Sequence, residues 1–82
     1  MNTIYLYTTL GCHLCEQAED IVRPYLQRYN ATVVLTEIAD SDELMARYGV
    51  RIPVLKAANG SSELGWPFDA SQAEGWLAEQ FL

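Results

Sequence analysis

Positively charged residues are scarce in this chain. Five Lys and Arg residues stand against eleven Asp and Glu residues, which leaves a formal net charge of −6 at pH 7. The basic residues are scattered along the sequence as Arg23, Arg28, Arg47, Arg51 and Lys56. Binding to nucleic acid or to an anionic membrane surface depends on a patch of Lys and Arg, so the composition argues against both kinds of partner.

Long apolar runs are also missing. A membrane-spanning helix needs about 18 or more consecutive apolar residues, and no stretch of this sequence approaches that length. The sequence does not open with the basic and apolar segments of a secretory signal either. We therefore expect a soluble, cytoplasmic protein. Because the chain has only 82 residues, half of them hydrophobic, we expect a single domain over residues 1–82.

Cysteine is rare too, since only Cys12 and Cys15 are present. A disulfide between them closes a very short ring, which restricts the unfolded chain little, so the pair indicates redox chemistry rather than a scaffold. The plainer alternative is two small core residues that happen to lie close. A closed zinc site needs four ligands, and His13 is the only histidine. Metal binding would therefore need two chains that share a site, for example around an iron–sulfur cluster.

Hydrophobic periodicity predicts the order strand-helix-strand-helix-strand-strand-helix. Pro24 should kink the first helix, and the β-branched run at 32–37 suits a buried parallel strand. The first crossover should be right-handed, and Asn59-Gly60 predicts a hairpin between the last two strands. Strands are expected at residues 3–7, 32–37, 53–57 and 62–65. Helices are expected over residues 13–29, from an N-terminus at 40–43 to Gly49, and after Asp69.

Polar residues indicate where the two later helices begin. The acidic run at 40–43 supplies the N-terminus of the second helix, which should end at Gly49. Asp69 can cap the last helix, with Gln72 as its capping-box partner. The buried face of this last helix would hold Ala73, Trp76, Leu77 and Phe81.

Cys12 falls where the first strand gives way to the first helix. Unpaired backbone N–H groups and the positive end of the helix dipole favour a thiolate there, so we predict that its pKa lies below the ordinary value of about 8.5. Cys15 lies one turn further into the helix, with a more buried sulfur that can resolve a mixed disulfide. His13 as a cation would strengthen the effect on Cys12, whereas Glu16 would oppose it.

Three segments resemble the short glutaredoxin-like members of the thioredoxin-fold superfamily. They are Tyr7-Thr8-Thr9-Leu10-Gly11-Cys12-His13-Leu14-Cys15, Arg51-Ile52-Pro53 and Gly65-Trp66-Pro67-Phe68-Asp69. The resemblance covers the whole chain and implies an α/β thioredoxin/glutaredoxin-like fold, with a four-stranded mixed sheet and three helices. It also implies that Cys12 attacks, that Cys15 resolves, and that Pro53 is cis and lies against the disulfide. The Ile52 backbone would then be free to pair with an extended substrate.

The sequence also departs from this family. Thr9 stands where glutathione-using members usually have lysine, and His13 and Leu14 replace the usual proline and tyrosine. Bulky residues fill the usually glycine-rich segment before the last helix, and only Asp69 could hold the amino group of glutathione. Two usual glutathione anchors are therefore missing, which leaves the choice between glutathione and protein disulfides open.

Several residues have two possible roles. Arg51 either supplies the missing positive charge or forms a solvated ion pair with Asp42 or Glu43. Trp66 and Phe68 either form the rim of the site or pack in the core, and Tyr7 has the same two options. The residues that we expect to shape the site or bind substrate are Gly11, His13, Leu14, Arg51, Ile52, Pro53, Trp66 and Asp69.

Together these features predict a monomeric dithiol–disulfide oxidoreductase that reduces protein or glutathione mixed disulfides. It needs no bound cofactor, since electrons would arrive from glutathione or a thioredoxin-type reductant. Two alternatives remain, a non-catalytic binding or adaptor module on the same fold and a dimeric metal or iron–sulfur carrier.

Overall fold

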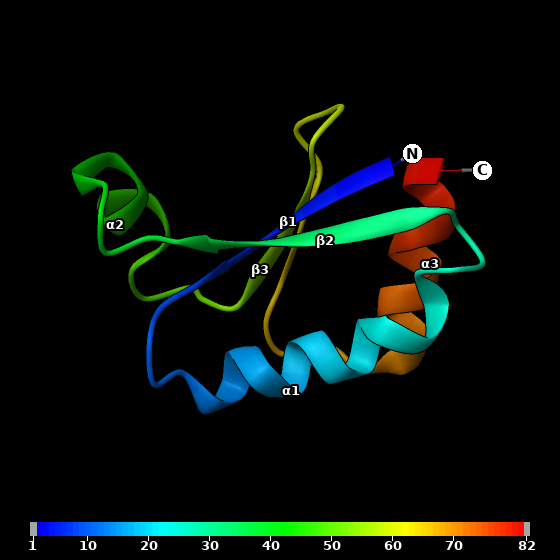
Figure 1. The fold of residues 1–82 in the computed structure, drawn as a ribbon, viewed down its shortest axis with the longest axis horizontal. Coiled ribbons are helices and arrows are strands. Elements are labelled where there is room, and N and C mark those ends of the chain that lie inside the picture. Colours follow the sequence, from blue (N-terminus) through cyan, green and yellow to red (C-terminus); the bar gives the residue numbers. More distant parts are fainter. Residues whose placement is uncertain (1, 82) are drawn as a thin grey trace.

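Four strands form one mixed sheet in the order β2-β1-β3-β4. A computed structural model describes residues 2–81 (Figure 1). In it, β1 (Asn2–Thr8) pairs in parallel with β2 (Ala31–Glu37) and antiparallel with β3 (Val54–Ala57), which in turn pairs antiparallel with β4 (Glu63–Gly65). The predicted element order, the parallel first pair and the final hairpin are confirmed. The hairpin loop is longer than a two-residue turn, because the strand pairing stops at Lys56 and Glu63.

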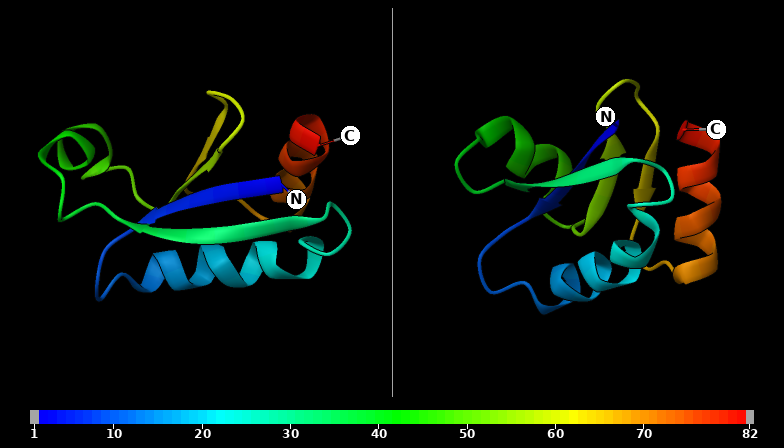
Figure 2. Two further views of the ribbon diagram at one scale, coloured as in Figure 1. Left: turned by 45° about the horizontal axis from the view of Figure 1, so that its top comes forward. Right: turned by 45° about the vertical axis from the view of Figure 1, so that its right-hand side comes forward.

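The helices distribute unequally around this sheet. Helix α1 (His13–Val22) and helix α3 (Ala70–Phe81) pack on one face, whereas the short α2 (Asp42–Tyr48) lies beyond one end of the sheet (Figures 1 and 2). The larger core cluster lies under α1 and α3 and includes Ile4, Leu6, Val22, Leu55, Trp76 and Leu77. A second, smaller cluster under α2 joins Tyr7, Ile38, Tyr48 and Val54. Residues 2–81 contain no helix whose length and hydrophobicity would allow it to span a lipid bilayer.

The helix caps follow the sequence closely. The Ser41 side chain caps α2 by accepting the Leu44 N–H, and Gly49 closes that helix. Asp69 Oδ1 accepts the Gln72 N–H while the Gln72 side chain accepts the Asp69 N–H, as expected for a capping box. The predicted buried face of α3 is confirmed, since Ala73, Trp76 and Leu77 are buried and Phe81 packs against them.

Pro24 ends the first α-helix, whereas the sequence predicted that it would only kink it. The α-helix stops at Val22, and a 3-10 helix, η1 (Arg23–Tyr25), follows with the proline near its start. Proline has no N–H to donate to the preceding turn, so a tighter turn can begin where the α-helical ladder breaks. Asn30 adopts φ 51°, a left-handed conformation that asparagine tolerates, and turns the chain into β2.

Strand β2 is parallel as predicted, but it lies at an edge of the sheet and is not buried. Val34 is 42% exposed and Leu35 is 55% exposed. A run of β-branched residues is compatible with an edge strand and with a buried strand. Such residues fit any pleated surface, so their presence does not indicate how many strands lie beside them. The sheet order, which depends on β3 pairing with the other side of β1, decides the outcome.

Candidate redox site

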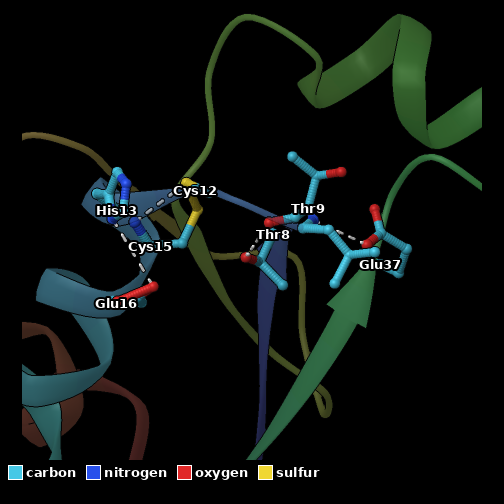
Figure 3. The surroundings of a disulfide bond; sticks show 8 residues. Thr8, Thr9, Cys12, His13, Cys15, Glu16 and Glu37 are labelled. Carbon is cyan, nitrogen blue, oxygen red and sulfur yellow. Dashed lines mark hydrogen bonds and ion pairs between the residues drawn. A yellow bond between two sulfur atoms is a disulfide. The ribbon is translucent and has the colours of Figure 1, made fainter.

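A disulfide joins Cys12 and Cys15 at the end of β1, where the chain turns into α1 (Figure 3). The connecting loop needs one residue with a left-handed backbone conformation, and Gly11 adopts it with φ 80°. The Cys12 N–H donates to the Thr9 carbonyl oxygen over 3.2 Å and so closes the loop just before the helix begins. The two cysteine Cα atoms lie 5.3 Å apart, one helical turn from each other.

The two sulfurs lie in different environments. Cys12 is the N-cap of α1, and its Sγ accepts the backbone N–H of Cys15 over 3.1 Å. Cys12 is partly exposed, whereas Cys15 is only 3% exposed. The sequence predicted both the helix-start position of the first sulfur and the deeper position of the second. An incoming reagent therefore has better access to Cys12.

His13 and Glu16 both extend into solvent beside the disulfide. Their closest atoms, His13 Nδ1 and Glu16 Oε2, are 3.9 Å apart, and both side chains are largely exposed. Exposed pairs of this kind contribute little free energy, because solvent screens the charges. Leu14, the other residue between the cysteines, is also exposed. This segment therefore presents its side chains outward around the sulfurs.

Glu37, at the end of β2, holds the loop that leads to Cys12. One carboxylate oxygen accepts the Leu10 N–H over 3.2 Å, and the other accepts the Ala39 N–H over 2.9 Å. These bonds, led by the one from Ala39, and a side-chain bond from Thr9 hold the Glu37 pKa below its ordinary value. Our sequence reasoning missed Glu37. Parallel pairing of residues 3–7 with 32–37 could have placed its position beside the loop, since Glu37 lies opposite Thr8.

The segment before β3 contains the cis Ile52–Pro53 bond that the family resemblance implied. Pro53 is fully buried, and its carbonyl oxygen accepts the Trp66 N–H over 3.1 Å. The Tyr48 carbonyl oxygen accepts the N–H groups of both Arg51 and Ile52. A second cis bond, Trp66–Pro67, lies in the segment after β4 and was not predicted.

Arg51 pairs with Glu63 of β4. The two side chains meet over 2.8 Å, and the guanidinium also lies 5.2 Å from the centre of the Tyr48 ring. The expected pair with Asp42 or Glu43 was wrong, because the β3–β4 hairpin brings Glu63 beside the end of α2. Tyr48 donates its hydroxyl to the other Glu63 oxygen over 2.5 Å.

This cluster shifts two pKa values in opposite directions. Burial, helped by the Glu63 hydrogen bond, raises the pKa of Tyr48 to about 12. The hydrogen bond from Tyr48, and then the one from Arg51, lower the pKa of Glu63. Both shifts favour the observed pair, a neutral hydroxyl donating to a charged carboxylate.

The aromatic residues divide between core and surface. Tyr7 is buried and stacks on Tyr48 with ring centres 4.1 Å apart, so it belongs to the smaller core cluster. Phe68 is buried in the larger cluster, and the half-buried Trp66 meets it edge-on with ring centres 5.1 Å apart. Asp69 is occupied as the cap of α3. Of the predicted rim pair, Phe68 is buried and Trp66 is only partly exposed.

A cavity of about 310 Å³ opens beside the disulfide, between the start of α1 and the end of β2. Both cysteines line it, together with residues of the β1–α1 loop, of α1 and of β2. Among residues 2–81, no cluster of three or more His, Cys, Asp or Glu side chains is arranged to hold a metal ion.

Comparison with known protein families gives a match over nearly the whole chain. Residues 3–78 match the model described as Glutaredoxin-like domain (DUF836). A search of curated proteins gave no match.

Solved structures also resemble this chain along most of its length. The X-ray structure of the structural genomics target protein XcR50 from X. campestris is 36% identical, covers 93% of this chain and 96% of its own, and has a TM-score of 0.79. Protein Ne2328 from Nitrosomonas europaea is 26% identical, with 92% and 89% covered and a TM-score of 0.78. A mutant thioredoxin from Halobacterium salinarum is 19% identical over 99% of this chain and 75% of its own, with a TM-score of 0.74, which shows a shared fold.

Proposed function

The chain belongs to the glutaredoxin-like family of thioredoxin-fold proteins, and from this we propose that it reduces disulfides of other molecules through Cys12 and Cys15. The family and the Cys-x-x-Cys pair support general thiol–disulfide redox activity. The observation that carries the proposal is the asymmetric disulfide, in which a partly exposed Cys12 caps α1 and a buried Cys15 lies one turn behind it.

In the first step, the Cys12 thiolate attacks one sulfur of the substrate disulfide. A disulfide forms between Cys12 and that sulfur, and the other substrate sulfur leaves as a thiolate that takes a proton from water. Helix α1 supports this step, because the Cys15 N–H already points at Cys12 Sγ and the positive end of the helix dipole favours a negative sulfur.

In the second step, Cys15 loses its proton to solvent and attacks Cys12 Sγ. The Cys12–Cys15 disulfide forms, and the bound substrate sulfur leaves as a thiolate that is protonated in turn. Over both steps the substrate disulfide gains two electrons from the two cysteines and two protons. One proton balances the one that Cys15 loses, and the other comes from solvent, because Cys12 starts as a thiolate. Two thiol equivalents from glutathione or from a thioredoxin-type dithiol return the protein to its starting state, with no bound cofactor.

Residues around the disulfide would shape the substrate surface. Gly11 allows the loop, His13 and Leu14 extend outward beside the sulfurs, and the cis bond fixes the Ile52–Pro53 backbone. The Ile52 N–H donates to the Tyr48 carbonyl oxygen and the Pro53 carbonyl oxygen accepts the Trp66 N–H, so these groups are not free to pair with an extended substrate, contrary to the expectation from the sequence. Trp66 is partly exposed, whereas Arg51 and Asp69 already have partners within the protein. We propose protein or glutathione mixed disulfides as substrates.

Single-cysteine variants test this function. Reduction of a peptide–glutathione mixed disulfide is measured for the wild type, Cys12→Ser and Cys15→Ser. We expect Cys12→Ser to lose the activity, and we expect Cys15→Ser to accumulate a mixed disulfide through Cys12 that mass spectrometry detects. Equal rates for the wild type and Cys12→Ser would overturn the proposal and favour a binding module.

A further inference from the structure

The cavity beside the disulfide forms an open groove between α1 and the edge strand β2. We call it the acidic groove and define it by Leu10, Glu16, Glu19, Leu35 and Glu37, which line the cavity together with Cys12. A molecule that occupies this groove therefore lies directly against the accessible sulfur. No lysine or arginine lines the cavity.

Two leucines give the groove an apolar floor and rim. Leu10 is 94% exposed and Leu35 is 55% exposed, so both offer apolar surface to a bound molecule. Leu35 lies opposite Leu6 of β1 and so on the face of the sheet that α1 covers. Although Val33 on the same face packs against the core, Leu35 remains open to solvent.

Three carboxylates give the groove its charge. Glu19 is paired with Arg23 over 3.1 Å, whereas among the described residues Glu16 has only the exposed His13 nearby, with His13 Nδ1 3.9 Å from Glu16 Oε2. The Glu37 carboxylate oxygens accept hydrogen bonds from backbone N–H groups. Because these bonds lower the Glu37 pKa, the side chain keeps its negative charge. The groove therefore attracts cations and repels anions.

The outer edge of β2 can accept an extended peptide segment. Within residues 2–81, β2 pairs with β1 on one side and no strand covers its other side (Figure 2). Such an edge can accept a further strand, and side chains of the added strand would point alternately toward and away from the groove.

We propose that the acidic groove binds an extended segment of a protein substrate that carries a basic residue beside an apolar residue, close to the disulfide to be reduced. The inference rests on the proposed function and adds a substrate class to it. Glutathione carries more carboxylates than amines, so the charge of the groove favours a cationic peptide over it. The apolar residue would pack on Leu35 while the basic residue meets Glu16 and Glu19.

The test uses two peptide probes that differ at one charged residue. Each has a cysteine in mixed disulfide with thionitrobenzoate, whose release is coloured, and the flanking residues are Lys-Leu in one probe and Glu-Leu in the other. With the reduced wild type we expect the Lys-Leu probe to react roughly tenfold faster at about 0.01 M salt. This ratio should fall towards unity at about 1 M salt, where the Debye length is about 3 Å.

Variants of the groove residues test whether the groove causes the difference in rate between the Lys-Leu and Glu-Leu probes. We expect Glu16→Gln combined with Glu19→Gln to lower the Lys-to-Glu ratio several-fold, and Leu35→Thr to slow the Lys-Leu probe relative to a Lys-Ala probe. The matched control for charge is Glu43→Gln combined with Glu79→Gln, on α2 and α3. The matched control for the strand is Val34→Thr, on the opposite face of β2. Both controls should keep the wild-type ratios.

The possible failures are distinguishable. Equal wild-type rates for the two probes, or a ratio that the groove variants leave unchanged, would overturn the docking proposal while the protein still reduces 2-hydroxyethyl disulfide. Failure to reduce any of these disulfides would overturn the proposed function and the docking proposal together.

Discussion

At the scale of single residues, Glu37 shows how one carboxylate can organise a loop that contains no charge of its own. It accepts N–H groups from Leu10 before the redox pair and from Ala39 after β2, so it ties the loop to the end of the sheet. The contact with Leu10 is not local along the chain, since Leu10 lies 27 residues from Glu37, whereas Ala39 is only 2 residues away. The side chain therefore positions Cys12 without touching it.

Replacing Glu37 with alanine should loosen this loop. Because the Leu10 and Ala39 N–H groups lose their acceptor, we expect their hydrogen exchange to accelerate at least several-fold. Glu37→Gln keeps one acceptor oxygen and should give an intermediate effect, and Glu79→Ala on α3 serves as the control. Unchanged Leu10 exchange in Glu37→Ala would contradict the positioning role.

The Tyr48 hydroxyl supplies the second residue-scale prediction. Tyr48→Phe removes the hydrogen bond to the Glu63 carboxylate, so at pH 7 we expect a loss of about 1 kcal/mol in the free energy of unfolding, measured with urea. Tyr25→Phe should change it less, because within residues 2–81 the Tyr25 hydroxyl makes no hydrogen bond.

The same bond predicts a pH dependence. Its formation lowers the Glu63 pKa from 4.5 in the folded protein, so the unfolded chain binds the proton first as the pH falls. The stabilisation is therefore complete above about pH 4.5 and is lost as the pH falls through the lower folded value. The stability of Tyr48→Phe should fall less steeply than that of the wild type in this window. Parallel curves for both proteins would contradict the assignment.

At the scale of elements, helix α3 depends on its first turn. Asp69→Ala removes the acceptor for the Gln72 N–H, and we expect a loss of about 1 kcal/mol in unfolding free energy. Gln72→Ala leaves that bond intact and should cost less, while Asp40→Ala, in the loop before α2, is a control. A loss with Asp40→Ala as large as with Asp69→Ala would show that the effect is general and does not come from the cap.

The elements also show what local sequence can predict. The caps at Ser41 and Asp69 and the start of α1 at Cys12 depend on residues within one turn, and all were predictable. The edge position of β2 depends on which strand pairs with the far side of β1, and no pattern inside residues 31–37 encodes that choice. The partners of Glu37 and Arg51 were missed for the same reason. The β1–β2 crossover brings Glu37 beside Leu10, and the β3–β4 hairpin brings Arg51 beside Glu63.

At the scale of the whole molecule, the two core clusters are built without the disulfide, although Cys15 is itself buried. Neither cluster contains Cys12 or Cys15, and both are built on the sheet and its helices. The fold therefore has a hydrophobic framework that does not depend on the redox state. This separation lets the redox pair change state while the framework stays in place.

Reduction should accordingly leave the protein folded. A ring this short contributes at most about 2 kcal/mol in the chain-entropy model, so the oxidised and reduced forms should differ by no more than that in unfolding free energy. Urea titrations of both forms, followed by circular dichroism, measure the difference. The Cys12→Ser and Cys15→Ser pair under the same conditions is the control, and unfolding on reduction would contradict this view.

The unequal access to the two sulfurs has a further consequence under oxidative stress. Peroxide reaching the partly exposed Cys12 would leave a sulfenic acid, with the Cys15 thiol one turn away. Condensation of the two groups releases water and restores the disulfide, which protects Cys12 from irreversible sulfinic and sulfonic acids. A protein built in this way survives repeated exposure to peroxide, provided that a thiol donor is present to reopen the bond.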